Sequence, residues 1–371
     1  MTQQISLVYG GRSVEHDCSI GMFNHFVSQA DQILARYNVA KIIYIDLSGE
    51  VTVYNCRPHE LPAHDEVVAS GVRVVADDLP KMLRIDGVFL FSLLQGQDGE
   101  DGRLQAVSEF FDLKSSCGHI LTNAVGNDKH LQHQIAVEAA PEIVPIKALL
   151  LSTQDSVPTD NDLAPFIGKE CVLKPNTGGG SFLTELVGNL ARQDVTDFAA
   201  RARPFCNHFL LQERVQGQDV TCGVLLRNRQ PELLPVAVLE TASKFFGYEE
   251  KWIKDEGYHV NFATVPVEVT ERVQRITRQL VHRFDYHTYC RFDFMIGENH
   301  EVYFLEVNTG PGLTEASIYP KMLKQAGLSL VDLLAAAIEN EEKNTDRRKQ
   351  FQQSVQSVRV SNHKGGDNIA A

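Results

Sequence analysis

The segment RFDFMIGENHEVYFLEVNTGPG, residues 291–312, constrains the fold more than any other part of the sequence. It contains two stretches in which apolar and polar residues alternate, separated by a short polar turn from Gly297 to His300. Alternation places successive side chains on opposite faces of a strand, and a short turn lets the two strands pair directly. The segment therefore predicts an antiparallel β-hairpin with one buried face.

One face of the predicted hairpin carries charged and amide side chains. Arg291 and Asp293 share a face of the first strand, and Glu306 and Asn308 share a face of the second. Folding about the turn places Asp293 opposite Glu306 and Arg291 opposite Asn308. Facing carboxylates repel each other, and a divalent cation would resolve the conflict, because magnesium binds carboxylate and amide oxygens together with substrate phosphates. The alternative is an exposed charge ladder in which Arg291 is the counter-ion.

The N-terminal part of the chain has the pattern of an α/β domain. Short apolar runs at 5–11, 40–47 and 86–94 predict buried strands, and helix-like stretches lie between them. This order predicts a mostly parallel sheet. Ligands of such sheets bind in loops at the carboxyl ends of the strands, which here are residues 10–19 and 95–105.

A second region begins near Leu121 and predicts a small α+β unit. A helix that ends at Pro141 is followed by a strand, the glycine loop KPNTGGGS at 174–181 and further strands. Glycines allow backbone N–H groups to approach a phosphate, and Lys174 directly precedes the loop. The segment is not a Walker A motif, because no Gly-Lys-Ser/Thr follows the last glycine. A mobile β-turn is the alternative interpretation.

A third region runs from about Gly217 and leads into the hairpin. Apolar residues within 269–284 follow a helical period, which predicts an amphipathic helix before the hairpin. After Asn344 the sequence becomes polar, and we expect its end to be disordered.

Length, charge and cysteine content restrict the class of protein. The chain has 371 residues, enough for two or three domains, and a formal net charge of -13. An acidic surface argues against nucleic acid or an anionic membrane as the main partner, although a locally basic pocket is compatible with it. The seven scattered cysteines form no Cys-x-x-Cys motif, and no leader or membrane-length apolar run is present. We therefore expect a cytoplasmic protein.

The loop GGRSVEHDCS follows the first predicted strand and opens a predicted helix. A helix N-terminus at this point would favour an anion, and Ser13 could cap it. Glu15 is alternatively an acidic residue of the first helical turn, which is a common placement.

Several motifs then occur in one order along the chain. They are Glu15 after two glycines, the GEDG loop, Asp-Lys at 128–129, KP…GGGS, FFGYEEKW and RFDF…EVNTGPG…YPK. This order resembles the D-alanine–D-alanine ligase family of the ATP-grasp superfamily over roughly residues 5 to 340. The hairpin and its NTGPG segment are the most specific part of the resemblance.

The resemblance implies an α/β and α+β fold with a three-domain ATP-grasp architecture. It implies an N-terminal parallel-sheet substrate domain (1–121), a central ATP-grasp subdomain (122–216), a C-terminal ATP-grasp domain with the magnesium site and a closing loop (217–344), and a polar tail expected to be disordered (345–371). It also implies ATP held between the central and C-terminal domains, two magnesium ions with manganese as an alternative, small amino-acid substrates and a homodimer.

The resemblance also implies roles for individual residues. Asp293, Glu306 and Asn308 look like metal ligands, and the ATP-binding positions are Lys129, Lys174, Glu213, Asp219 and Lys251. Glu15 looks like the acceptor for the ammonium of the first amino acid, with Ser181 on the glycine loop near it. Arg291 and the Gly312 backbone would hold the transition-state oxyanion, and Ser317 would hold the carboxylate of the second amino acid.

Two positions of the substrate site depart from the family pattern. The tyrosine after the loop lysine is Trp252, whose indole donates a hydrogen bond but relays no proton, and the histidine before the GEDG loop is Gln95. We therefore expect an ATP-dependent carboxylate–amine ligase that works through an acyl phosphate and either forms D-alanyl-D-alanine or joins a related pair. The alternatives are an amino-acid ligase of specialised metabolism with a different second substrate and a catalytically silent nucleotide-binding protein.

Overall fold

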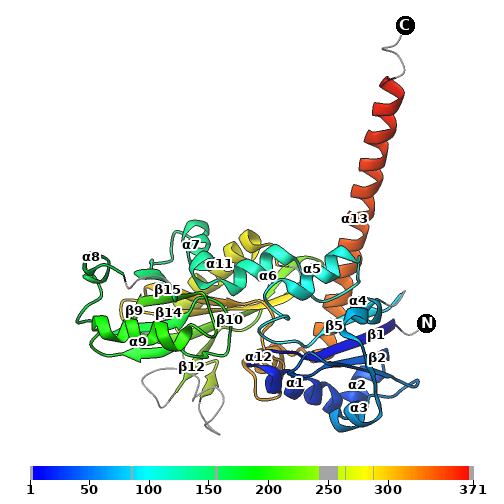
Figure 1. Ribbon diagram of the computed structural model, residues 1–371, viewed down its shortest axis with the longest axis horizontal. Coiled ribbons are helices and arrows are strands. Elements are labelled where there is room, and N and C mark those ends of the chain that lie inside the picture. Colours follow the sequence, from blue (N-terminus) through cyan, green and yellow to red (C-terminus); the bar gives the residue numbers. More distant parts are fainter. Residues whose placement is uncertain are drawn as a thin grey trace.

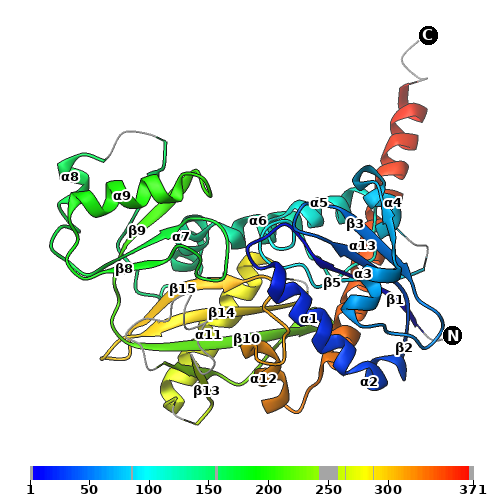
Figure 2. The same ribbon diagram turned by 60° about the horizontal axis from the view of Figure 1, so that its bottom comes forward.

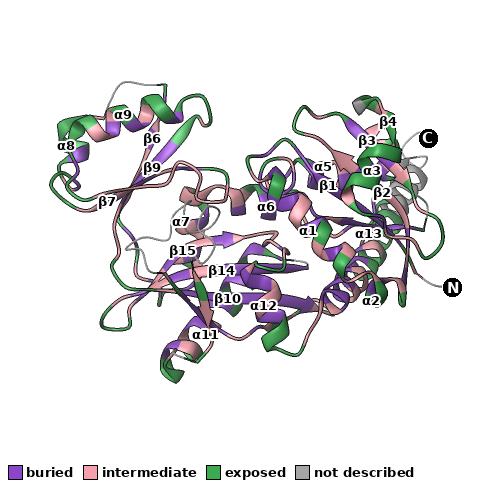
Figure 3. Cartoon of the chain, turned by 90° about the horizontal axis from the view of Figure 1, so that it is seen from below, coloured by how far each residue is buried: buried purple, intermediate pink, exposed green. Residues whose placement is uncertain are grey.

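The computed structural model describes residues 3–84, 87–154, 158–241, 258–263, 265–286 and 288–366. The strands form three sheets (Figure 1). Figure 2 shows the central sheet and the N-terminal sheet at opposite ends of the molecule. The buried residues follow the sheets and the helix faces that cover them (Figure 3). No helix of the described residues combines the length and the apolar character needed to cross a lipid bilayer.

The N-terminal sheet has the strand order β4-β3-β2-β1-β5. Its strands are β1 (Gln3–Gly10), β2 (Tyr37–Ile45), β3 (Val51–Asn55), β4 (Val72–Val74) and β5 (Phe89–Ser92). The three strands β2, β1 and β5 are parallel, as predicted, whereas β3 and β4 add an antiparallel edge. The reason is the short connection between β2 and β3, which cannot contain the crossover that a parallel pair needs.

Helices cover both faces of this sheet. They are α1 (His16–Ser28), α2 (Ala30–Leu34), α3 (His64–Ser70), η1 (Ala76–Asp78), α4 (Leu79–Leu83) and α5 (Arg103–Phe110). The alternation along β1 decides the faces: Leu7 belongs to the core under α1 to α3, and Val8 belongs to the core under α4 and α5. The loop from β1 into α1 therefore begins at the carboxyl end of a central parallel strand, which is where such folds place ligands.

The central sheet is antiparallel and has the strand order β6-β9-β7-β8. Its elements are β6 (Ala148–Ser152), α8 (Asp160–Leu163), β7 (Cys171–Pro175), β8 (Glu185–Val187), α9 (Arg192–Ala202) and β9 (His208–Glu213). The predicted strand, glycine loop and strand are confirmed as β7 and β8 with residues 176–184 between them. A separate apolar core under α9, which includes Phe198 and Leu173, stabilises this sheet.

The C-terminal sheet has the strand order β13-β12-β10-β14-β15, and β11 also pairs with β10. Its strands are β10 (Gln218–Arg227), β11 (Gln230–Leu233), β12 (Ala237–Glu240), β13 (His259–Asn261), β14 (Tyr289–Ile296) and β15 (Val302–Asn308). The predicted amphipathic helix is α11 (Val267–Phe284), whose Val273, Ile276 and Leu280 are fully buried in the core of this sheet.

Two helices that precede the central sheet in the sequence pack on the C-terminal sheet instead. They are α6 (Ile120–Asn127) and α7 (Lys129–Ala139), and Ala136 of α7 belongs to the same core as α11. The amide oxygen of Gln132 accepts a hydrogen bond of 2.7 Å from the backbone N–H of Val307 on β15. The start of α7, with Lys129, is thereby held beside the hairpin.

The hairpin register is the predicted one. Asp293 pairs with Glu306 and Arg291 pairs with Asn308 across β14 and β15, with an irregularity directly after Asp293. Phe292 and Phe304 point to the other face, where both are fully buried in the core beneath α11. The apolar face therefore fixes the direction in which the polar face points.

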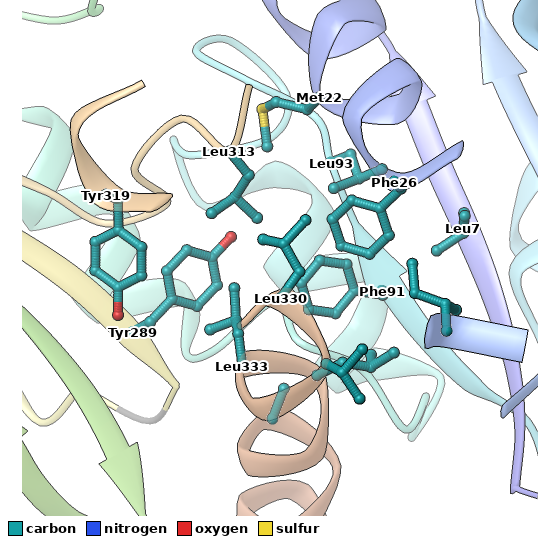
Figure 4. Packing of buried hydrophobic residues seen from close by; sticks show 14 of the residues in the cluster. Leu7, Met22, Phe26, Phe91, Leu93, Tyr289, Leu313, Tyr319, Leu330 and Leu333 are labelled. Carbon is teal, nitrogen blue, oxygen red and sulfur yellow. The ribbon is translucent and has the colours of Figure 1, made fainter. Parts of the chain in front are cut away.

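The N-terminal and C-terminal regions share one hydrophobic core. Figure 4 shows Leu313, which follows the hairpin, between Met22 and Leu93 of the N-terminal region and Tyr289 of β14. The same core contains Tyr319 of α12 (Ile318–Gln325) and Leu333 of α13 (Leu330–Gly366). The two regions therefore position each other, and loops from both can meet at one site.

The C-terminal tail differs from the expectation of disorder. The chain continues as helix α13 to Gly366, and this helix projects away from the rest of the molecule (Figure 1). Its first part is held by buried Leu333 and Leu334 and by Asn340, whose side chain donates to the carbonyl of Leu226 at 2.6 Å. The polar composition that suggested disorder is equally that of a helix exposed to solvent, because Glu, Lys, Arg and Gln are good helix formers.

The core behind the hairpin makes a direct prediction. Replacing Phe292 by alanine should lower the free energy of unfolding by about 3–5 kcal/mol, because it leaves a cavity in a fully buried core. Phe351→Ala is the matched control, since Phe351 is 70% exposed on α13. Urea unfolding of both variants checks this, and equal effects would contradict the assignment of Phe292 to the core.

Candidate active site

A cavity of about 920 Å³ lies between the hairpin, the glycine loop and the loop that opens α1. Eight residues of the predicted site line it, namely Glu15, Lys129, Lys174, Ser181, Glu213, Asp219, Asp293 and Glu306. A smaller neighbouring space of about 50 Å³ is lined by Gln95 and Asn308, among others. The structure thus brings together residues that lie almost 300 positions apart in the chain.

The carboxylate of Asp293 is the most heavily bonded group of the site. Arg291 donates to both of its oxygens, from Nε at 2.9 Å and from Nη2 at 2.8 Å. Thr221, on the neighbouring strand β10, donates to Oδ1 at 2.6 Å, and the Asn308 amide donates to Oδ2 at 2.9 Å. Burial lowers the pKa of Arg291, but Asp293 and then Glu306 outweigh it, so the net shift is upward.

These residues fit a magnesium ion by the chemistry of their donor atoms. Asp293 and Glu306 supply carboxylate oxygens, and Asn308 has an amide whose oxygen becomes a ligand when the group turns over. Among the described residues no group of three or more His, Cys, Asp or Glu side chains could hold a metal. The hairpin set is therefore a partial shell of the kind that substrate phosphates complete.

Two lysines line the same cavity as the carboxylates. Lys129 begins α7, which is capped by the side chain of Asp128, and its Nζ donates to the carbonyl of Gly178 on the glycine loop. The same Nζ lies 4.0 Å from a carboxylate oxygen of Glu306. Lys174 stands on β7 directly before the glycine loop. Carboxylates and ammonium groups thus line one cavity, as a metal–polyphosphate ligand requires.

The glycine loop has a strained backbone. Gly178 and Gly180 have positive φ angles of 94° and 64°, and Ser181 also has a positive φ, of 56°. The side chain of Asn127 fixes the loop by accepting a hydrogen bond of 2.8 Å from the Gly178 N–H. A non-glycine residue in the left-handed region costs free energy, and such strain is often found at binding sites.

Glu15 lies between two glycine loops. It caps the start of α1, and its backbone N–H donates to the hydroxyl of Ser13 at 3.1 Å. A Cβ atom added to Gly96 would lie 2.5 Å from the Glu15 carboxylate, and one added to Gly179 would lie 2.6 Å from it. Only glycine therefore permits this approach at Gly96 and Gly179, and Ser181 lines the same cavity as Glu15.

Four residues surround the segment that follows the hairpin, and we call them the Gly312 cluster: Cys18, Gln95, Gly312 and Ser317. The position of a Cβ on Gly312 would be 3.0 Å from the Ser317 hydroxyl and 3.8 Å from both Cys18 Sγ and Gln95 Oε1. The Gln95 amide donates to the carbonyl of Gly310 at 2.6 Å. Elements from both ends of the chain thus converge beside Arg291.

The far end of the cavity suits a flat, partly apolar ligand. Val172, Leu239 and Leu305 line it. Glu213, at the end of β9, accepts a hydrogen bond of 3.1 Å from Lys169, and Asp219 lies on β10 opposite Met295. The carboxylates of Glu213 and Asp219 could accept hydrogen bonds from the hydroxyl groups of a ribose or from the amino group of a base.

Comparisons with known proteins agree with this geometry. A family model described as "D-ala D-ala ligase C-terminus" matches residues 152–339. The chain belongs to the D-alanine–D-alanine ligase family.

Whole-length relatives support the assignment beyond the matched segment. A D-alanine--D-alanine ligase of Bacteroides fragilis is 27% identical over 340 residues, which cover 92% of this chain and 99% of that protein. D-alanine--D-alanine ligase A of Salmonella typhimurium is 25% identical over 353 residues, covering 91% of this chain and 94% of that protein. The chain is accordingly an ATP-dependent ligase that forms C–N bonds.

Solved structures agree on the fold. The D-alanine-D-alanine ligase from Coxiella burnetii superposes with a TM-score of 0.76 at 24% identity and covers 97% of this chain and 100% of that one. VanG D-Ala:D-Ser ligase from Enterococcus faecalis has the same TM-score of 0.76 at 23% identity, with 92% and 100% covered. The predicted three-domain ATP-grasp architecture is thereby confirmed as a fold.

Two residues of the predicted ligase site, Lys251 and Trp252, lie outside the described residues, as does the whole of the predicted closing loop, residues 243–257. One residue that our sequence interpretation did not assign to the site is Glu100. Its carboxylate accepts hydrogen bonds from the backbone N–H groups of Gly96 at 2.7 Å and Gly310 at 3.0 Å. Burial, followed by repulsion from Glu15, raises the pKa of Glu100 well above its ordinary value. The GEDG motif contains this residue, but nothing local shows that it binds a loop more than 200 positions away.

The link through Glu100 predicts a loss of stability on a nearly isosteric change. In Glu100→Gln one acceptor oxygen becomes an NH2 group, so one of the two backbone N–H groups loses its partner. We expect the free energy of unfolding to fall by about 1–3 kcal/mol. Glu298→Gln, at the exposed hairpin turn, is the control. Urea unfolding measures both, and a change as small as that of the control would refute the link.

His133 predicts a dependence of stability on pH. Burial, and then Lys174, lower the pKa of His133 to about 4, and its Nε2 accepts the Ile146 N–H at 3.3 Å. In the unfolded chain His133 has its ordinary pKa of about 6.5, so below that pH it binds a proton more readily there than in the native state. The free energy of unfolding therefore falls as the pH drops from about 6.5 towards 4. His133→Gln should reduce that slope of unfolding free energy against pH, whereas His282→Gln, on the exposed side of α11, should leave it unchanged.

Proposed function

We propose that this ligase joins two molecules of D-alanine to form D-alanyl-D-alanine for the cell wall, with release of ADP and phosphate. The observation that carries the proposal is the hairpin register, which sets Asp293, Glu306 and Asn308 on one face, while Lys129 and Lys174 line the same cavity as the two carboxylates. The relatives that match the chain over its whole length are named D-alanine--D-alanine ligases.

The chemistry requires that a carboxylate become an electrophile. ATP converts the carboxylate of the first amino acid into an acyl phosphate, the amine of the second attacks its carbonyl carbon, and phosphate leaves. We assign Lys129 and Lys174 to neutralise the charge that moves onto the β-phosphate during transfer. Two magnesium ions held by Asp293, Glu306 and Asn308, with manganese as an alternative, would supply further charge neutralisation at the phosphates.

The amino acids occupy the other end of the site in this proposal. Glu15 accepts the ammonium group of the first amino acid, which places its carboxylate towards the lysines. Arg291 and the Gly312 N–H stabilise the oxyanion of the tetrahedral intermediate. Ser317 binds the carboxylate of the second amino acid, helped by the N-terminus of α12. Glu213 and Asp219 bind the adenosine.

One observation favours a second candidate, a ligase of specialised metabolism with a different second substrate. Gln95 takes the place of a family histidine and points its amide at Gly310, with its Oε1 in the Gly312 cluster. A neutral amide neither titrates near neutral pH nor relays a proton as imidazole does. The altered group binds the loop that leads to Ser317, so it would change the choice of amine, while the carboxylates and lysines assigned to activation are all present.

Phosphate release distinguishes the two candidates. Purified protein is supplied with ATP, magnesium and D- or L-amino acids, singly and in pairs, and the products are identified by mass spectrometry. Release with D-alanine alone, giving the dipeptide, supports the first candidate. Release only with another pair supports the second, and no release with any amino acid would overturn both. A cytoplasmic location and a homodimer belong to the same proposal, and sedimentation analysis tests the dimer.

The metal site makes a sharper prediction. Glu306→Gln removes one charged ligand, so phosphate release should fall by about 100-fold or more, and the magnesium concentration for half-maximal rate should rise. Glu298→Gln, on the same hairpin but at its exposed turn, should behave as wild type. Titration calorimetry with magnesium and ADP provides a readout independent of turnover. Equal magnesium affinity of the two variants would remove Glu306 from the metal site.

A further inference from the structure

Tyr258 lies where the C-terminal sheet meets the Gly312 cluster. It directly precedes β13 and is packed, half-buried, against the core that the N-terminal and C-terminal regions share. Its hydroxyl donates to the carbonyl of Ala316 at 3.2 Å. The ammonium of Lys321 lies over its ring, 5.3 Å from the centroid. Tyr258 therefore contacts residues on both sides of Ser317.

Groups assigned to the site influence the pKa of the same phenol. Burial raises the pKa of Tyr258, Arg291 lowers it and Cys18 raises it further, with a net upward shift. The phenol is thus neutral at physiological pH and acts as a hydrogen-bond donor. Arg291 on β14 and Cys18 of the Gly312 cluster thus act on the phenol electrostatically, while its direct contacts are with Ala316 and Lys321 on either side of Ser317.

The acceptor of this hydrogen bond has a direct connection to Ser317. The carbonyl of Ala316 and the N–H of Ser317 belong to one planar peptide group, so holding the carbonyl also orients the N–H. That N–H donates to the carbonyl of Thr314 at 3.0 Å, and the hydroxyls of Thr314 and Ser317 are 2.7 Å apart. The turn that presents Ser317 at the start of α12 is therefore fixed from outside by the phenol.

We propose that Tyr258 is a positioning residue that sets the binding of the second amino acid by holding the Ala316–Ser317 peptide group. The proposal rests on the assignment of Ser317 to the carboxylate of the second amino acid. It predicts that the phenol hydroxyl affects only substrates that have a carboxylate for Ser317 to bind. A merely structural tyrosine, which packs β13 against α12, would affect every substrate and the stability of the fold alike.

The test compares Tyr258→Phe with wild type, using D-alanine or the pair that the phosphate-release screen identifies. Loss of one hydrogen bond should raise the KM of the second amino acid roughly 2- to 10-fold while the KM for ATP stays unchanged. The amide of that amino acid, D-alaninamide for D-alanine, can act only as the amine, because it has no carboxylate to activate. With the amide as second substrate the difference between Tyr258→Phe and wild type should vanish.

Two further variants extend the comparison, one at the same position and one as a control at another tyrosine. Tyr258→Leu also removes the ring beneath Lys321 and should raise the same KM further. Tyr54→Phe removes a hydroxyl that donates to Glu60 at 3.0 Å on the N-terminal sheet, and it should change no KM. Thermal unfolding confirms that each variant folds.

The outcomes separate this proposal from the function on which it rests. An unchanged KM in Tyr258→Phe, or an equal loss with the amino acid and its amide, overturns the role of Tyr258. If wild type releases no phosphate with any amino acid, the proposed function fails instead. Titration calorimetry of D-alanine into protein loaded with a non-hydrolysable ATP analogue then decides on Tyr258 alone: weaker binding by Tyr258→Phe supports the role, and equal binding overturns it.

Discussion

The carboxylates of Asp293 and Glu306 face each other across β14 and β15, and the surrounding side chains offset the repulsion between the two charges. Asp293 receives hydrogen bonds from Arg291, Thr221 and Asn308, so its charge is balanced before any ligand arrives. The ammonium group of Lys129 lies 4.0 Å from a carboxylate oxygen of Glu306. When a metal–nucleotide ligand binds, the two carboxylates would exchange their present partners for the ligand. The charged groups are already in place, which reduces the reorganisation that binding requires.

The parts of the fold that could be predicted are those specified by local periodicity. The hairpin register follows from alternation because a slip by one residue would put Phe292 and Phe304 into water and the carboxylates into the core. The helix 267–284 follows from the spacing of Val273, Ile276 and Leu280 for the same reason. The polar tail could not be assigned in this way, because its composition suits both a disordered segment and an exposed helix such as α13.

The site was predictable where the resemblance named its residues, and not where contacts between distant loops create it. Glu100 accepts a hydrogen bond from the Gly310 N–H, and His25 of α1 donates to the carbonyl of Leu313 at 2.6 Å. No periodic pattern in the sequence predicts either contact. The close approach of Gly179 to the Glu15 carboxylate is likewise set by the way the glycine loop meets the N-terminal region. Such details depend on how two sheets share a core, which a single sequence does not reveal.

The two ends of the site are therefore stabilised in different ways. The phosphate end belongs to regular elements, since Asp293 and Glu306 are on paired strands and Lys129 opens a helix held by Gln132. The end that we propose for the amino acids is made of loops, which are joined by side-chain hydrogen bonds such as those from Gln95 to Gly310 and from Tyr258 to Ala316. A substitution at the second end can redirect a loop by a fraction of an ångström without disturbing the first. A ligase of this family can consequently change the amine that it accepts while keeping the machinery of carboxylate activation, and Gln95 is placed where such a change would act.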